Sequence, residues 1–153
     1  MNTKNLPDGR IWRGRQVVAA LIVHTRQILL GLRSANRDFY PNVWDMFGGH
    51  VEPGELPDQT LVRELKEELG ITPTDWTYLE TLTLPISSPD PQNQPAETLM
   101  VYLYRVTKWK GTPYNRQPEE HSVIHWFSVA EAAGLELADA SYPGLFARYI
   151  DEV

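Results

Sequence analysis

The segment 57–69, PDQTLVRELKEEL, restricts the fold of this chain more than any other because its apolar residues follow the period of an α-helix. Leucines recur at every fourth position, which places them along one side of the helix: Leu61, Leu65 and Leu69. Proline suits the first turn of a helix, and Gly70 suits the position just past its end. We therefore predict a helix over 57–69 that packs an apolar stripe against the rest of the molecule.

Most other regular segments have the composition of β-strands. Residues 16–34 read as two strands joined by a turn at 24–27, and VVAALIV is apolar and β-branched enough for a buried strand. Further strands are predicted at 43–47, ending in Gly48-Gly49, and at 76–85, 98–109 and 122–127. A capping box at 128–131 predicts a short helix, and 144–152 predicts a closing helix. The sum is an α+β fold in one domain, 1–153, with a loose segment over about 1–12 and loops at 36–42, 87–97 and 111–120.

The bulk composition excludes several classes of function. The chain has a net charge of −6, and an acidic chain is poorly suited to long nucleic acids, which need a basic surface. It contains no cysteine, which removes disulfides, thiol catalysis and cysteine-based zinc sites. No apolar run is long enough to span a bilayer and the N-terminus lacks a signal-peptide pattern, so we expect a cytoplasmic protein that does not enter a membrane. Either a monomer or a homodimer is compatible with the sequence.

Three acidic residues crowd into five positions of the predicted helix: Glu64, Glu67 and Glu68. On a helix these residues share one face, and each like-charge pair at this spacing costs about 0.2–0.5 kcal/mol. A solvated, glutamate-rich helix face is one interpretation of the pattern. The other is a site for a divalent cation, because Mg²⁺ is usually held by a few carboxylates together with substrate phosphates. Glycines just ahead of the helix let backbone groups approach a ligand closely.

The spacing of these residues resembles the Nudix box, which is a Gly, five residues, a Glu, seven residues and then Arg-Glu-(aliphatic)-x-Glu-Glu-x-Gly-(aliphatic). Each specified position has its counterpart in this chain: Gly49, Glu55, Arg63, Glu64, Leu65, Glu67, Glu68, Gly70 and Ile71. The resemblance implies an α/β/α sandwich with a mixed sheet, in which a loop–helix–loop carries the catalytic residues. It also implies Mg²⁺, or Mn²⁺ in its place, bound by the three helix glutamates and a backbone carbonyl of Gly48 or Gly49. Glu55 and Arg63 would form an internal pair, so that Arg63 orients the carboxylates rather than contacting substrate.

Nudix enzymes hydrolyse a nucleoside diphosphate linked to another group X, so the resemblance implies a pyrophosphohydrolase with a small nucleotide substrate. In such a reaction metal ions neutralise the phosphates and activate a water, and a Glu takes the proton of that water. The candidates for this base are Glu67, Glu68, Glu119 and Glu120, and an acid from the region of the last two adds a metal contact in some family members. A solvated loop is the alternative interpretation of Glu119 and Glu120. Arg33 is a candidate phosphate contact, with a plain surface arginine as the alternative.

The segment 28–55 is most similar to the MutT-type branch of the family, which acts on nucleoside triphosphates or their oxidised-purine forms. The positions that carry this likeness are Leu30, Gly31, Arg33, Trp44 and Phe47-Gly48-Gly49. Some members read the base with an Asn close to the position of Asp45, and the change to Asp leaves the base preference open. Asp139 and Tyr142 are further candidates to meet the base, while a helix-flanking cap is the alternative role of Asp139. An ADP-ribose or nucleotide-sugar pyrophosphatase and a non-catalytic nucleotide sensor remain the alternative functions.

Overall fold

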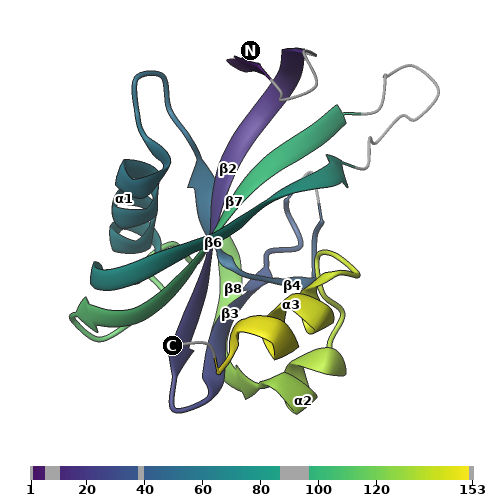
Figure 1. The fold of residues 1–153 in the computed structure, drawn as a ribbon. Helices are drawn as coiled ribbons and strands as arrows, with labels where there is room; N and C mark the ends of the chain where they lie inside the picture. Colours follow the sequence, from purple (N-terminus) through teal and green to yellow (C-terminus); the bar gives the residue numbers. More distant parts are fainter. Residues whose placement is uncertain (1, 6–10, 38–39, 87–96, 152–153) are drawn as a thin grey trace.

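The structure is a computed structural model that describes residues 2–5, 11–37, 40–86 and 97–151. A twisted β-sheet lies between helix α1 (Pro57–Leu69) on one side and helices α2 (Val129–Ala133) and α3 (Tyr142–Tyr149) on the other (Figure 1). This three-layer arrangement confirms the α+β class and the α/β/α sandwich. Helix α1 has the bounds predicted from its leucine period. Within the described ranges, none of the helices has the length and apolar character needed to cross a membrane.

The described residues form eight strands, which are in chain order β1 (Asn2–Asn5), β2 (Ile11–His24), β3 (Gln27–Arg33), β4 (Trp44–Asp45), β5 (Phe47–His50), β6 (Thr72–Ile86), β7 (Glu97–Lys110) and β8 (His121–Ser128). Strand β2 is central and pairs in parallel with β7 and antiparallel with β1, β3 and β5. Strand β7 also pairs with β6, and β3 also pairs with β4 and β8, in each case antiparallel. The parallel β2–β7 pair makes the sheet mixed, as the family resemblance implies.

Strand β2 is buried on both faces because each face meets a helical layer. Val18, Ala20 and Ile22 pack in one core with the leucine stripe of α1, whereas Ala19 and Leu21 pack in a second core with α3. All five side chains are at most 7% exposed. Burying a leucine-sized side chain stabilises a fold by about 1.5–3 kcal/mol. The leucine stripe therefore fixes α1 on the sheet, and the acidic face of the helix is fixed with it.

Three segments differ from the sequence prediction. The strand predicted over 43–47 is two strands, β4 and β5, and Gly48-Gly49 lies inside β5 rather than after a strand. A Cβ on Gly48 would lie 1.8 Å from the Val18 carbonyl oxygen, so the backbones of β5 and β2 come closer there than a side chain permits. The segment predicted to be loose contains β1, whose backbone groups pair with the start of β2 despite its polar composition. Helix α3 begins two residues before the predicted start, since its second residue is a proline that suits the first turn.

Two local predictions are confirmed. The hairpin between β2 and β3 turns on Thr25 and Arg26, whose φ angles of 47° and 62° are typical of a two-residue hairpin loop. Ser128 and Glu131 form the capping box of α2, in which the Glu131 amide donates to Ser128 Oγ at 3.1 Å and the Ser128 amide donates to Glu131 Oε1 at 2.9 Å. The loop predicted over 87–97 falls almost wholly on 87–96, which lie outside the described residues.

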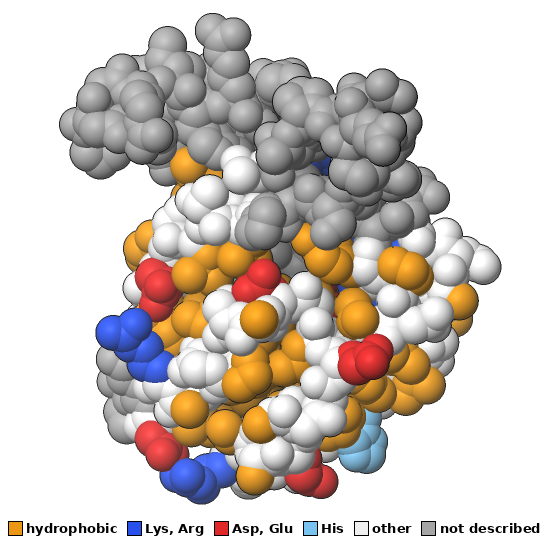
Figure 2. Space-filling model, turned by 90° about the vertical axis from the view of Figure 1, so that its right-hand side faces the viewer, with side chains coloured by type: hydrophobic (Ala, Val, Ile, Leu, Met, Phe, Trp, Pro, Cys, Tyr) orange, Lys and Arg blue, Asp and Glu red, His pale blue; other side chains and the backbone are white. Residues whose placement is uncertain are grey.

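Figure 2 shows the face of the molecule that lies to the right in Figure 1. Hydrophobic and uncharged side chains cover most of its described part, and acidic side chains lie singly among them. In that described part, Lys and Arg side chains lie toward the margins, so this face presents no broad basic surface of the kind that long nucleic acids require.

Candidate active site

A cleft of about 470 Å³ is bounded by α1, by strands β2 and β5 and by the start of β8. Clefts of this size accommodate small molecules. Its walls include the residues that the sequence singled out for catalysis, metal binding or substrate binding: Arg33, Asp45, Gly48, Gly49, Arg63, Glu64, Glu67, Glu68, Glu120, Asp139 and Tyr142. Glu55 and Glu119 are not among the residues of its wall. The fold thus gathers residues from most of the chain around one space.

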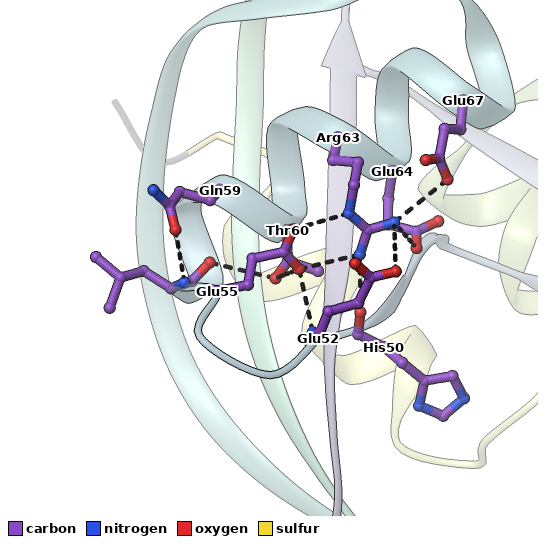
Figure 3. Close-up of polar contacts among 9 residues, drawn as sticks. His50, Glu52, Glu55, Gln59, Thr60, Arg63, Glu64 and Glu67 are labelled. Atoms are coloured by element: carbon purple, nitrogen blue, oxygen red, sulfur yellow. Dashed lines mark hydrogen bonds and ion pairs between the residues drawn. The ribbon is translucent and has the colours of Figure 1, made fainter.

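Arg63 is the centre of a network of carboxylates (Figure 3). Its Nε lies 2.8 Å from Glu55 Oε2 and its Nη2 lies 3.0 Å from Glu55 Oε1, so the two side chains pair as a fork. Its Nη1 donates to Glu64 Oε1 at 2.8 Å and to Glu67 Oε2 at 3.3 Å. Its Nη2 also donates to the carbonyl of His50 in β5 at 3.0 Å. One guanidinium therefore positions two of the three helix glutamates and ties them to the strand.

Glu55 lies in the loop before α1 and anchors Arg63. Besides the fork, it accepts hydrogen bonds from Thr60 Oγ1 at 2.6 Å and from the Glu52 amide at 3.2 Å. The hydrogen bonds from Arg63 lower the pKa of Glu55 to about 2, so this carboxylate is ionised at neutral pH. The same bonds raise the pKa of Arg63 above its ordinary value. The pair is internal to the loop–helix–loop, which is the arrangement that the family resemblance implies.

Glu64 lies against the backbone of β5. Its side chain is 14% exposed, and burial raises its pKa to about 7 against the lowering effect of Arg63. A Cβ on Gly49 would lie 2.3–2.7 Å from three atoms of the Glu64 carboxyl group. Only a glycine at position 49 allows the carboxylate to approach the strand this closely. The close approach explains why a glycine precedes the acidic helix at this distance.

Glu68 is the most deeply buried of the three helix glutamates, with a side chain 3% exposed. Its Oε1 accepts a hydrogen bond from the Gly48 amide at 2.9 Å. Burial, reinforced by the charge of Glu64, raises the pKa of Glu68 well above its ordinary value. An ionised carboxylate at such a position needs a positive partner. Glu67 lies further out and is 46% exposed.

The donor atoms of this face fit a divalent cation. Carboxylate oxygens are the ligands that Mg²⁺ and Mn²⁺ prefer, and these three come from one turn of α1 beside the Gly48-Gly49 backbone. The raised pKa values of Glu64 and Glu68 show that Arg63 alone does not compensate their charge. A bound divalent cation would offset both their burial and their mutual repulsion.

His121 is a cleft residue that sequence reasoning missed. It opens β8, is 4% exposed and places Nδ1 3.7 Å from Glu68 Oε2. Burial lowers the pKa of His121 to about 4, so the imidazole is neutral at neutral pH. One donor atom from each of Glu68, Glu120 and His121 lies within 4.8 Å of the other two. The signal in the sequence is the position of His121 beside a candidate acid, but its inward orientation depends on tertiary packing.

Asp45 is the centre of a second polar group in the cleft. Its Oδ1 accepts hydrogen bonds from the Tyr142 hydroxyl at 2.9 Å and from the Met46 amide at 2.8 Å, and its Oδ2 lies 3.5 Å from Arg33 Nη1. Burial raises the pKa of Asp45, while Arg33 opposes the rise. Burial also raises the pKa of Tyr142, so its hydroxyl stays protonated and can donate. The Arg33 side chain is 15% exposed and its Nε donates to the Tyr40 carbonyl at 3.0 Å, so the interpretation as a plain surface arginine is wrong.

Asp139 lines the cleft and also caps a turn. Its Oδ2 accepts hydrogen bonds from the Ser141 amide at 2.9 Å and from the Ser141 hydroxyl at 2.5 Å, just before α3 begins. The helix-flanking role expected as the alternative is therefore present, at the edge of the space that a ligand would enter.

Arg15 and Arg37 also line the cleft, and the sequence singled out neither of them. Arg37 lies in the loop after β3. Its Nη1 is buried, has no hydrogen-bond partner among the described residues and lies 3.8 Å from Glu120 Oε2. Buried guanidinium nitrogens are normally hydrogen-bonded. Arg37 Nη1 is therefore a candidate to donate a hydrogen bond to an anionic ligand. The sequence of the loop does not indicate this role.

Comparisons with known proteins decide the family. A family model described as NUDIX domain matches residues 13–149. The chain belongs to the Nudix hydrolase family. A CTP pyrophosphohydrolase of Escherichia coli K12 is 36% identical over 128 residues, which cover 84% of this chain and 86% of the relative. An 8-oxo-dGTP diphosphatase of the same organism is 28% identical over 130 residues, which cover 84% and 91%.

Solved structures of Nudix proteins share the fold of this hydrolase. The solution structure of the E. coli ORF135 protein has a TM-score of 0.68 at 31% identity and covers 92% of this chain and 95% of its own. A MutT NUDIX hydrolase from Burkholderia pseudomallei has a TM-score of 0.68 at 26% identity and covers 78% and 87%. The MutT-like branch expected from the segment around Trp44 and Phe47 is thus confirmed.

Proposed function

We propose that this Nudix hydrolase is a nucleoside triphosphate pyrophosphohydrolase that releases a nucleoside monophosphate and pyrophosphate. The proposal rests on the observation that one cleft contains both the acidic face of α1, which suits a metal ion, and the hydrogen-bonded Asp45–Tyr142 pair, which suits a nucleobase. The printed activities of the relatives, on CTP and on 8-oxo-dGTP, support the same substrate class. We also propose a single Nudix domain over 1–153, in line with a family match over 13–149.

The proposed cofactor is Mg²⁺, with Mn²⁺ as a substitute, held by the three helix glutamates and a backbone carbonyl of Gly48 or Gly49. When bound, such a cation neutralises phosphate charge and lowers the pKa of a bound water. Arg63 supports binding without contacting substrate, because its Nη1 holds Glu64 at 2.8 Å and Glu67 at 3.3 Å. Glu55 in turn fixes the plane of the guanidinium.

The attacking water needs a carboxylate to take its proton. Among the candidate bases, Glu67 and Glu120 are 46% and 41% exposed, which leaves room for a water beside them. Glu68 is 3% exposed and already accepts from the Gly48 amide, which suits a ligand role better than a base role. We therefore assign the role of general base to Glu67 or Glu120. Glu119 lies outside the cleft wall and has no part in the proposal.

The substrate is expected to lie between the arginines and the Asp45–Tyr142 pair. Arg37 is a phosphate contact in this proposal because its buried Nη1 has no hydrogen-bond partner in the described residues. Arg33 holds Asp45 and adds positive charge nearby. In this proposal Asp45, Tyr142 and Asp139 contact the polar edge of the nucleobase. The faces of the nucleobase would lie against apolar cleft residues: Leu84, Leu99 and Val101. A cytoplasmic location and the choice between monomer and homodimer stay predictions.

A coupled phosphate-release screen tests the proposal. Purified protein with Mg²⁺ is given normal and oxidised dNTPs, NTPs, ADP-ribose, nucleotide sugars and dinucleoside polyphosphates, with pyrophosphatase or phosphatase as the coupling enzyme in separate runs. We expect pyrophosphatase to reveal turnover of one or more nucleoside triphosphates. Turnover that only phosphatase reveals would instead indicate an ADP-ribose or nucleotide-sugar pyrophosphatase. Silence on every compound, with and without EDTA, would favour a nucleotide sensor.

A further inference from the structure

We infer that Glu68, Glu120 and His121 form a metal position with one nitrogen ligand, which favours Mn²⁺ over Mg²⁺. This inference rests on the proposed function in one respect, that a divalent cation binds in the cleft. It adds an imidazole to a site that the sequence predicted to be made of oxygen ligands alone. With Glu120 as a ligand, Glu67 is the general base of the proposed reaction. Donor atoms of the three side chains lie within 4.8 Å of one another, which is compatible with one ion, whose opposite ligands lie about 4 Å apart.

The metal position formed by Glu68, Glu120 and His121 differs from the part of the acidic face that Arg63 holds. Arg63 Nη1 donates to Glu64 Oε1 and Glu67 Oε2, so one oxygen of each of these carboxylates already has a cationic partner. The Glu68 carboxylate receives its hydrogen bond from the Gly48 amide instead, and its Oε2 lies on the side of His121. Glu68 therefore lies outside the group of carboxylates that Arg63 holds, and its second oxygen is available to an ion beside His121.

His121 is held as a preorganised ligand would be. A Cβ on Gly31 would lie 2.6 Å from its ring, and the Phe47 ring packs against it with centroids 4.9 Å apart. The His121 carbonyl accepts from Asn115 Nδ2 at 2.7 Å, which fixes the backbone at this point. The 3.7 Å between Nδ1 and Glu68 Oε2 is too long for a hydrogen bond, so Glu68 does not occupy this nitrogen.

The chemistry of an imidazole ligand sets the expected selectivity. A neutral imidazole nitrogen is a common ligand of transition metals, whereas Mg²⁺ prefers oxygen ligands and keeps several waters. Mn²⁺ accepts carboxylate oxygens and imidazole nitrogens together. A site with two carboxylates and one imidazole is therefore expected to bind Mn²⁺ more tightly than Mg²⁺.

A structural histidine is the rival interpretation, and electron spin-echo spectroscopy of bound Mn²⁺ separates the two. One equivalent of Mn²⁺ is added to the full chain, and ¹⁴N modulation from a coordinated imidazole is measured. We expect modulation in the wild type, its loss in His121→Gln, and its retention in His50→Gln and His125→Gln, which alter another cleft histidine and an exposed histidine of β8. Absence of modulation in the wild type, or its persistence in His121→Gln, would overturn the inference.

A second variant keeps the test independent of any folding defect in His121→Gln. Glu120 is 41% exposed, so Glu120→Gln is expected to fold, and its dissociation constant for Mn²⁺ should rise about tenfold or more. Glu119→Gln is the matched control, because Glu119 is the adjacent acid outside the cleft wall, and its constant should not change. Unchanged Mn²⁺ affinity in Glu120→Gln would overturn the inference. If the wild type shows Mg²⁺-dependent turnover but no ¹⁴N modulation, this inference alone is rejected. If the wild type shows no metal-dependent turnover at all, the proposed function is rejected.

Discussion

The guanidinium of Arg63 and the carboxylate of Glu55 meet as a fork, with distances of 2.8 Å from Nε to Oε2 and 3.0 Å from Nη2 to Oε1. The pair fixes the plane of the guanidinium, and Nη1 is thereby directed at Glu64 and Glu67. A cation that binds these acids meets ligands that are already oriented, which lowers the cost of ordering them.

Replacing Arg63 with lysine tests this orienting role. A lysine ammonium is a compact point charge and cannot reproduce the fork with Glu55. We expect Arg63→Lys to lower kcat about 10–100-fold while the circular dichroism spectrum stays unchanged. Lys66→Ala serves as the control, since this exposed side chain lies on a neighbouring face of α1 and activity should persist. A wild-type kcat in Arg63→Lys would show that the carboxylates do not depend on the fork.

The same pair predicts how stability depends on pH. The pKa of Glu55 is about 2 in the folded chain and 4.5 in its ordinary state, so between these values the unfolded chain binds more protons than the native one. The free energy of unfolding should therefore decrease as the pH falls from about 4.5 toward about 2. Urea unfolding should show a steeper decrease for the wild type than for Glu55→Gln, which has no carboxyl group to protonate. Equal slopes would argue against the ion pair.

The part of the site that lies in one continuous segment is predictable from the sequence. Glu55, Arg63 and the three helix glutamates belong to a single loop and helix, and the helical period places the acids on one face. His121 and Arg37 are different, because they approach Glu68 and Glu120 from β8 and from the loop after β3. The pairing of β3 with β8 brings those segments together, and no short-range pattern encodes that register.

Gly48 and Gly49 also show that strand pairing is not predictable from a local stretch of sequence. A glycine inside a strand and a glycine after a strand look alike in sequence, so the prediction placed Gly48-Gly49 after the strand. Their place inside β5 depends on the antiparallel pairing of Gly48 with Ala19 and of Gly49 with Val18 in β2. The close backbone approach at Gly48 is a tertiary contact that a local reading of the chain does not contain.

Gly49→Ala tests whether activity depends on the position of the Glu64 carboxylate, in a protein that stays folded. The added Cβ would overlap the Glu64 carboxyl group at 2.3–2.7 Å, so that side chain must move away from β5. We expect kcat to fall about tenfold or more while the protein stays folded. Gly144→Ala is the control, because its added Cβ would meet no atom of the described residues within 4 Å, and alanine stabilises a helix by about 0.5–1 kcal/mol relative to glycine. Full activity in Gly49→Ala would show that Glu64 does not act from this position.

Asp45→Asn tests base recognition. The substitution keeps an acceptor for the Tyr142 hydroxyl and the Met46 amide but replaces Oδ2, 3.5 Å from Arg33, with an amide donor. We expect the ratios of kcat/KM among CTP, UTP, ATP and GTP to change about tenfold or more, with a smaller change in Tyr142→Phe. Ratios that stay constant in both variants would mean that another part of the cleft reads the base.

Glu67→Gln and Glu68→Gln test the acidic face directly. Each variant is nearly isosteric and removes one negative charge, so we expect kcat to fall about 10²–10⁴-fold with the fold intact. Glu119→Gln is the matched control outside the cleft wall, and its kcat should equal that of the wild type. Normal activity in both Glu67→Gln and Glu68→Gln would remove the basis for a metal site on α1.

Product identity tests the central claim most directly. The preferred nucleoside triphosphate is incubated with the protein and Mg²⁺, and the products are followed by phosphorus NMR with and without EDTA. We predict nucleoside monophosphate and pyrophosphate in equal amounts, formed only while the divalent cation is free to bind. Formation of nucleoside diphosphate and orthophosphate, or turnover that EDTA leaves unchanged, would contradict a metal-dependent pyrophosphohydrolase.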